Sequence, residues 1–180
     1  MANICCGEVY FKGFSGNLMV INDVLNSFIK EKKKISLIDL KEKLGLDYDA
    51  DFKYAVQDFD YDGNNLLRMS FEFAWDCHAD YLNAIAKKYD LKWSGLFDVE
   101  GEGYFKVDPL DVFKENYLVD IHDDNNLGLP NEIFEFFIET NEVAEYLNKA
   151  SGQNCSYKEW KETLDEADIG GIYEIEEEFL

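Results

Sequence analysis

Hydrophobic and polar residues recur with two different periods in the first quarter of the chain. Residues 4–12 alternate loosely, which predicts a strand. An amphipathic helix should follow, because Ser15 or Asn17 can cap its start and its apolar residues recur at helical spacing. The segment 36–39 resembles a capping box, which predicts a second, short helix that Gly45 would end.

The clearest pattern is that of a β-hairpin formed by residues 52–61 and 66–75. Apolar side chains occupy alternate positions on both arms, and the connecting residues 62–65, Asp-Gly-Asn-Asn, are types that tolerate positive φ in a tight turn. A further helix face appears at residues 81–89, and two more strands are expected within residues 91–107. The order of elements up to this point is β, α, β, β, α, β, with one extra strand.

The last third of the chain mixes helical and extended patterns. Residues 115–122 are expected to form a strand. Pro130 can open a helix, and the apolar positions between 133 and 138 fit helical spacing, although a strand is an alternative there. Residues 143–164 carry two short helical patterns, and residues 172–176 alternate as a strand with one acidic face.

These elements predict an α+β protein in two parts. We expect an antiparallel sheet packed against helices over residues 1–107, and an acidic, mixed α/β extension, residues 108–180, packed on it. The 180 residues are 47% hydrophobic and 16% aromatic, so the apolar area suffices for a folded core. No apolar run approaches the roughly 18–20 residues that cross a bilayer. The first residues do not resemble a secretory signal and the four cysteines lack framework spacing, so we expect a cytoplasmic protein.

The charge of the chain is strongly negative and unevenly distributed. It contains 38 acidic and 17 basic residues, which gives a formal net charge of -21. The first 46 residues carry +2, residues 47–180 carry -23, and residues 162–180 contain eight acids and no base. This balance excludes nucleic acid, heparin or an anionic membrane as the main partner. A solvated acidic surface is the simplest interpretation.

The size of the excess favours a second interpretation. A compact chain of this length has a diameter of about 40 Å, and B-form DNA carries about 24 charges over that distance. The net charge of -21 therefore matches that of a duplex segment of equal length. Because like charges held together destabilise the compact state, we interpret the excess as an adaptation to a cationic partner.

Four segments of the first 107 residues carry a recognisable pattern. They are Met1–Cys5, Leu67–Trp75, which ends Phe-Glu-Phe-Ala-Trp, Ala86–Tyr89, and Phe97–Phe105, which contains Glu-Gly-Glu-Gly-Tyr-Phe. Together they resemble the YubB ferredoxin-like domain family. The resemblance implies a ferredoxin-like fold and an origin on plasmids, phages or other mobile elements, and it carries over no catalytic residue. Two features depart from the family: Trp75 is followed by Asp-Cys-His instead of Ser-Pro-Pro, and the acidic region beyond about Asp108 has no counterpart.

Motifs that could carry chemistry are incomplete. Residues 58–63 match the first half of a calcium loop, but Met69 stands where a closing glutamate is needed, so we interpret them as an acidic hairpin that could bind a divalent cation weakly. Cys77-His78 lacks a third, orienting group and reads as an ordinary helix start. No cysteine or histidine spacing suggests zinc, and Gly101-Glu102-Gly103 lies among acids that repel phosphate. We expect no catalytic residue, metal or cofactor.

We therefore expect a non-enzymatic inhibitor of the anti-CRISPR or anti-restriction type. It would imitate nucleic acid and occupy the Lys/Arg-lined channel of a host defence enzyme, without binding nucleic acid itself. The alternative is an intracellular adaptor or regulatory module that binds a basic protein without mimicry. The expected partner-binding residues are Asp165, Glu166, Asp168, Glu174, Glu176, Glu177, Glu178, Asp98, Glu100, Glu102, Asp120, Asp123 and Asp124.

Overall fold

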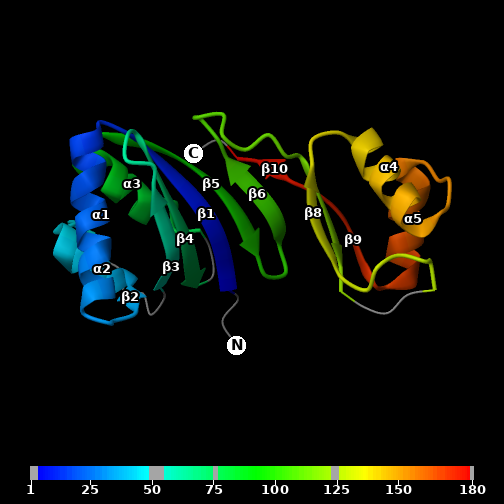
Figure 1. Ribbon diagram of the computed structural model, residues 1–180, viewed down its shortest axis with the longest axis horizontal. Helices are drawn as coiled ribbons and strands as arrows, with labels where there is room; N and C mark the ends of the chain where they lie inside the picture. The colour runs from blue at the N-terminus through cyan, green and yellow to red at the C-terminus, as the bar shows by residue number, and fades with distance from the viewer. Residues whose placement is uncertain (1–3, 49–54, 75–76, 123–125, 179–180) are drawn as a thin grey trace. The chain divides into compact units, whose positions relative to one another are not determined.

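The structure is a computed structural model of a mixed α+β protein (Figure 1). The residues it describes fall into four segments, 4–48, 55–74, 77–122 and 126–178. The chain divides into two compact units. We call residues 1–113 together with 177–180 the N-terminal unit, and residues 114–176 the C-terminal unit. Among the described residues, no helix has the length and apolar character needed to cross a membrane.

A large antiparallel sheet forms the framework of the N-terminal unit (Figure 1). In spatial order its strands are β10 (Glu176–Glu177), β6 (Gly103–Val107), β5 (Leu91–Val99), β1 (Ile4–Gly13), β4 (Leu66–Ala74), β3 (Ala55–Tyr61) and β2 (Ile35–Ser36). The central strand β1 is paired on both sides, so that Val9 lies opposite Met69 of β4 and Gly95 of β5.

Three helices pack against one face of this sheet. They are α1 (Ser15–Lys30), α2 (Leu37–Leu44) and α3 (Ala79–Lys88). Every second residue of β4 is buried toward them, which is the period of a strand with one covered face. The buried residues of this strand are Leu67, Met69, Phe71 and Phe73. Leu25, Phe28 and Tyr81 of the helices complete the same core.

The starts of the first two helices differ in how their amides are satisfied. The hydroxyl of Ser36 accepts a hydrogen bond from the amide of Asp39 at 3.1 Å, so α2 begins as the sequence predicts. For α1 the prediction is wrong, because both suggested caps lie inside the helix. The N-cap is Phe14, since β1 ends only one residue earlier, and Phe14 has no side-chain cap. Asn17 instead donates from Nδ2 to the carbonyl of Tyr89 at 2.8 Å, which ties α1 to the end of α3.

The predicted hairpin is confirmed in the described residues by the pairing of β3 with β4. Tyr61 lies opposite Leu67, next to the turn. The Oδ1 atom of Asp62 accepts hydrogen bonds from the amides of Asn64 and Leu66, at 2.8 and 3.1 Å. An aspartate that bonds to amides two and four positions later explains why the turn forms at these residues.

The segment that follows β6 crosses the sheet face opposite the helices. The amide of Leu110 donates to the hydroxyl of Ser94 at 3.0 Å, and the ring of Phe113 meets that of Tyr10 edge-to-face at 5.4 Å. These contacts extend the N-terminal unit to residue 113, whereas the sequence suggested a boundary after residue 107. The expected packing of residues 108–180 on the N-terminal domain stays a prediction.

The C-terminal unit combines a three-stranded antiparallel sheet with two helices (Figure 1). In spatial order the strands are β8 (Ile133–Phe137), β7 (Tyr117–Ile121) and β9 (Gly170–Glu174), and the helices are α4 (Thr140–Ser151) and α5 (Tyr157–Ala167). The core of the unit lies between this sheet and the helices. Trp160 is fully buried there, and its Nε1 donates to Oδ1 of Asn148 at 2.8 Å, which links α5 to α4.

Residues 133–138 form no helix, because Ile133–Phe137 is strand β8. Phe134 lies opposite Asp120 of β7. The helix begins only at Thr140, after a capping box in which Glu139 is the N-cap. The apolar positions fit both periods, and pairing with β7, which lies far away in sequence, decides in favour of the strand.

Candidate functional site

The charge of the C-terminal unit lies on its surface. Its sequence contains 16 acidic residues and four lysines, a net charge of -12. Fourteen of these acids belong to described residues; twelve are exposed, and Glu115 and Asp120 are half-buried. Because none of the fourteen is buried, the unit presents a field of negative charge to the solvent.

The end of α5 holds the first group of sequence-predicted contact residues. Asp165 and Glu166 lie in the last turn, and Asp168 is the C-cap in the left-handed conformation, with φ of 53°. All three are exposed, and no basic residue lies in this turn. The C-terminus is the negative end of the helix dipole. The structure therefore brings together three carboxylates at a place where negative charge lowers helix stability.

Glu174 does not join this group. Its Oε1 accepts a hydrogen bond from Nζ of Lys161 at 3.1 Å. Lys161 precedes Asp168 by seven positions in the sequence, which corresponds to about 10 Å along a helix axis. Glu174 is therefore paired with a lysine near the middle of α5, away from the carboxylates at the end of that helix.

The last three predicted acids follow β9 into the other sheet. Glu176 and Glu177 form β10, which pairs with β6, and Glu178 comes directly after it. The amide of Glu178 donates to the carbonyl of Lys106 at 2.8 Å. All three side chains are exposed. They form a short acidic edge of the N-terminal sheet.

The first of the two shorter acidic segments ends β5 and forms the turn to β6. Asp98, Glu100 and Glu102 are all exposed. Glu100 is held to β1 by two bonds, because its amide donates to the carbonyl of Ile4 at 3.0 Å and its Oε2 accepts from the amide of Ile4 at 3.1 Å. Asp98 lies opposite Tyr104 of β6. These three carboxylates lie together at one end of the strand pair.

The second shorter segment follows β7. Asp120 is half-buried, and its Oδ1 lies 3.9 Å from Nδ1 of His122. Asp123 and Asp124 lie outside the described residues. The sequence-predicted acids of the described residues thus occupy several separate places: the end of α5, β9, β10, the turn between β5 and β6, and β7.

Sequence reasoning missed a charged group on the face of the N-terminal sheet opposite the helices. Nη1 of Arg68 donates to Oε2 of Glu8 at 3.0 Å, and Nη2 donates to Oδ2 of Asp58 at 2.5 Å. The Arg68 guanidinium lowers the pKa of the Asp58 carboxyl. On the same face, partial burial raises the pKa of the Cys6 thiol, and the carboxylates of Glu72 and of β5 add to this effect. Strand alternation would have predicted this group if the pairing of β1 with β4 had been known.

The aspartates of the calcium-like pattern serve the hairpin. Asp58 pairs with Arg68, and Asp62 accepts the amide hydrogen bonds of the turn. Within the described residues, no three acidic, cysteine or histidine side chains are grouped in a way that could hold a metal ion. Weak cation binding by residues 58–62 stays a prediction.

A shallow groove of about 520 Å³ lies between β8 and α4. Its apolar wall contains Phe137 and Tyr146, whose ring centroids are 5.2 Å apart. Burial raises the pKa of the Tyr146 hydroxyl, and the carboxylate of Glu135 raises it further. The remaining lining residues are Glu115, Phe136, Ile138, Glu142, Glu145 and Lys149. Sequence reasoning missed this groove, because it arises where residues 133–138 form a strand.

Apolar side chains beside this groove are exposed to solvent. Phe134 is 57% exposed and Ile138 is 47% exposed. The rings of Phe134 and Phe136 meet edge-to-face, with centroids 5.4 Å apart. Exposed aromatics next to carboxylates are typical of surfaces that bind another protein.

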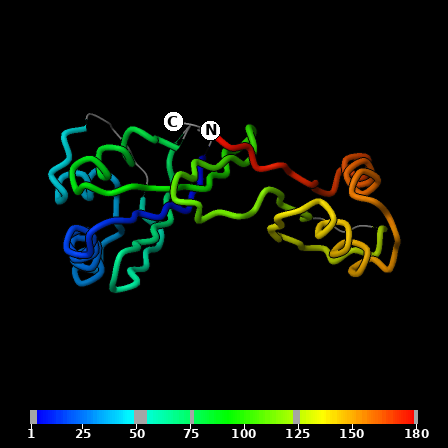
Figure 2. The backbone as a smooth tube through the Cα atoms, turned by 90° about the horizontal axis from the view of Figure 1, so that it is seen from above, coloured from blue at the N-terminus to red at the C-terminus, as the bar shows by residue number. Residues whose placement is uncertain are grey.

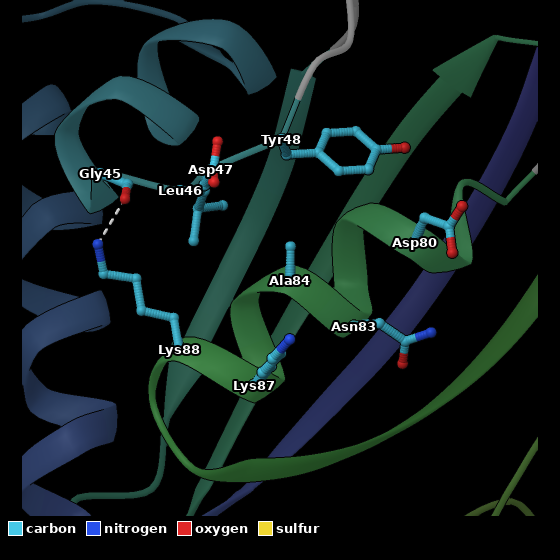
Figure 3. A pocket seen from close by; sticks show the side chains of 9 residues that line it. All are labelled: Gly45, Leu46, Asp47, Tyr48, Asp80, Asn83, Ala84, Lys87 and Lys88. Carbon is cyan, nitrogen blue, oxygen red and sulfur yellow. Dashed lines mark hydrogen bonds between the residues drawn. The ribbon is translucent and has the colours of Figure 1, made fainter.

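A second hollow lies in the N-terminal unit, between the end of α2 and α3 (Figure 3). It has a volume of about 670 Å³. Asp80, Lys87 and Lys88 line it from α3 and Asp47 lines it from the segment after α2, and Nζ of Lys88 donates to the carbonyl of Gly45 (Figure 3). Two ammonium groups balance two carboxylates here, so the lining favours neither an anion nor a cation.

Comparisons with family models, with curated proteins and with solved structures found no match to this chain.

Proposed function

We propose that the chain is a non-enzymatic inhibitor that binds a basic, nucleic-acid-binding protein in competition with nucleic acid. The observation that carries this proposal is the surface charge of the C-terminal unit, which has twelve exposed carboxylates and only four lysines. Such a field attracts a Lys/Arg-lined channel over long distances, as the phosphates of nucleic acid do. Carboxylates kept at the unfavourable end of α5 agree with selection for binding and not for stability.

We also propose that the N-terminal unit is a ferredoxin-like scaffold, as its resemblance to the YubB family implies. The spatial order β5-β1-β4-β3, with α1 and α3 as the connecting helices, supports this, because it is the order of a split βαβ arrangement. The same resemblance suggests a plasmid or phage origin. The target would then be a host defence enzyme such as a CRISPR effector or a restriction enzyme, met in the cytoplasm of the host cell.

A competition measurement tests the proposal. Labelled duplex DNA or guide RNA is bound to purified CRISPR effectors and restriction enzymes, and the full chain is titrated in while fluorescence anisotropy is followed. We expect displacement of the nucleic acid from at least one enzyme, and a steep loss of the inhibitor's affinity between about 50 and about 200 mM salt. If no enzyme in the panel releases its nucleic acid, the proposal fails.

A triple substitution locates the contact. Asp165→Asn, Glu166→Gln and Asp168→Asn remove three exposed charges, and asparagine tolerates the left-handed C-cap. At about 0.5 kcal/mol for each exposed pair, competition should weaken about tenfold. A matched control neutralises three exposed acids of the N-terminal unit, Asp23, Glu42 and Asp47. If the two triple variants weaken competition equally, the contact does not lie at the end of α5.

The alternative function, an adaptor for a basic protein, is favoured by one observation. Phe134 is 57% exposed on β8, a strand at the edge of its sheet. A strand edge of this kind can bind a peptide whether or not nucleic acid is present. The same titration separates the two functions, because an adaptor would bind its partner equally well in the presence of saturating nucleic acid.

A further inference from the structure

We propose that β8 binds an extended, basic segment of the partner protein as an added strand, with Lys or Arg alternating with apolar residues. This inference rests on the proposed function and names the part of the partner that is captured. Basic nucleic-acid-binding proteins often carry Lys/Arg-rich arms that are unfolded alone. An added strand would order such an arm and withdraw it from nucleic acid.

The position of β8 makes an added strand possible. Within the described residues, β8 pairs with β7 on one side only, so its outer row of backbone groups has no strand partner. Proteins usually protect such edges with lysine, proline or a bulge. Residues Ile133–Phe137 contain no lysine and no proline, and their pairing with β7 is regular over five positions.

The two faces of β8 determine which side chains the added strand should carry. Ile133, Glu135 and Phe137 point to the helix side, where Glu142 and Glu145 line the groove beside α4. By strand alternation Phe134 lies on the opposite side, and the ring of Phe136 meets it edge-to-face. A strand added here would meet an excess of carboxylates over the single ammonium group of Lys149 on one face, and aromatic rings on the other. Basic and apolar residues at alternate positions satisfy both faces, because side chains on neighbouring strands meet on the same face.

Charge complementarity also argues against a second copy of this chain as the occupant. A second β8 would bring its own Glu135 and its flanking Glu132 and Glu139 against the same residues. Like charges facing each other across a strand pair are destabilising. The C-terminal unit of each copy also carries a net charge of -12, which opposes self-association.

The probes are three fluorescent peptides of identical composition in lysine and valine. One alternates Lys-Val, one carries the lysines and valines in separate blocks, and one alternates but is N-methylated at every second amide. Anisotropy with the full chain should show the alternating peptide binding about tenfold more tightly than the other two, because only it can pair along β8 with matching faces. Equal binding by all three would show charge attraction alone and would overturn the inference.

Substitutions place the peptide on β8. Phe134→Ser should weaken the alternating peptide about fivefold or more, since it removes an exposed ring that the peptide would cover. Glu135→Gln should weaken it at low salt and less at high salt. The matched control Tyr173→Ser, at an exposed aromatic residue of the other edge strand β9, should leave affinity unchanged. Unchanged binding by Phe134→Ser with an intact thermal transition sinks the inference.

Two further outcomes separate this inference from the proposed function. If the peptides fail but the full chain still displaces nucleic acid, the strand addition is wrong and the proposed function stands. If the peptides bind but no enzyme releases its nucleic acid, the proposed function is wrong. The added strand would then not come from a nucleic-acid-binding partner. Sedimentation that shows dimers lost on Phe134→Ser would identify a second copy as the occupant and would contradict the inference.

Discussion

Gly170 starts β9 at a point where the chain passes very close to β7. Its φ is 133°, a conformation that residues with side chains rarely adopt. A Cβ atom placed there would lie 2.1 Å from the carbonyl oxygen of Asp120. Because that oxygen belongs to the backbone of the paired strand, it cannot move aside without disturbing the sheet. Only glycine therefore fits at this position.

We predict that Gly170→Ala lowers the free energy of unfolding by clearly more than about 1 kcal/mol, the usual loss at a left-handed glycine. The matched control is Gly152→Ala, at a glycine with φ of 74° and open space around its Cβ position. Denaturant unfolding followed by circular dichroism measures both losses. Similar losses in the two variants would mean that the close approach to β7 has no energetic weight.

For single residues, the sequence predicts interactions with near neighbours well and interactions with residues far along the chain poorly. Ser36 and Gly45 were identified because a cap and a left-handed C-cap depend on neighbours within a few positions. Asn17 was misread as a cap, because its real partner, the carbonyl of Tyr89, lies 72 positions away. The role of Gly170 was invisible for the same reason, since it depends on β7.

The end of α5 shows a conflict between charge and stability within one element. Asp165 and Glu166 occupy the last turn, where their carboxylates face the negative end of the helix dipole. The start of the same helix is favourable, because Ser156 and Glu159 form a capping box. The hydrogen bonds from Ser156 lower the pKa of the Glu159 carboxyl. One helix therefore carries a stabilising acid at its start and destabilising acids at its end.

Neutralising the acids at the end of α5 should stabilise the protein. We predict that Asp165→Asn with Glu166→Gln raises the free energy of unfolding by about 0.5–2 kcal/mol at low salt, while weakening competition with nucleic acid. Glu159→Gln is the matched control and should lower stability, because it weakens the capping box. Thermal unfolding at neutral pH shows whether each variant is more or less stable than the parent protein. A double variant that is less stable than the parent would remove the argument that these acids are kept for binding.

Among the elements, the sequence identified most helices and strands and left one undecided. The helices over 140–151 and 157–167 follow from apolar spacing and end signals that lie inside each segment. For residues 133–138 both periods fitted, and only pairing with β7 settled the outcome. The spatial order of the strands, and with it the groove beside β8, depends on contacts that no local pattern encodes.

For the whole molecule, the dominant physical feature is the net charge of -21. Exposed salt bridges such as Lys158 with Glu162 offset little of it, because such pairs are screened by water. Repulsion among the remaining carboxylates acts against the compact state. Folding must therefore be supported mainly by the two apolar cores.

Salt should raise the thermal stability of the chain. Between about 10 and about 150 mM monovalent salt the screening length falls from about 30 to about 8 Å, so the mutual repulsion of the carboxylates weakens. We predict a transition temperature that rises over this range in calorimetry. A fall would show that the surface ion pairs outweigh the repulsion.

The acidic character of the candidate site was predictable from composition, but its arrangement was not. From the sequence, the acids after residue 162 were expected to act as one group. In the structure Glu174 pairs with Lys161, and Glu176–Glu178 lie at the edge of the other sheet. Strand β9 and the return to β10 separate acids that are close in sequence, and those turns depend on the fold.

The chain passes between the two units twice, once after Phe113 and once before Glu177, as the tube in Figure 2 traces. The acidic unit is therefore an insertion and not a tail. A protease that cuts the second connection leaves the first intact. A cut in the first leaves residues 177–178 hydrogen-bonded to β6. A cut in the second connection would thus leave the acidic unit covalently joined to its scaffold, whereas a cut in the first would leave only the pairing of β10 with β6 to hold it.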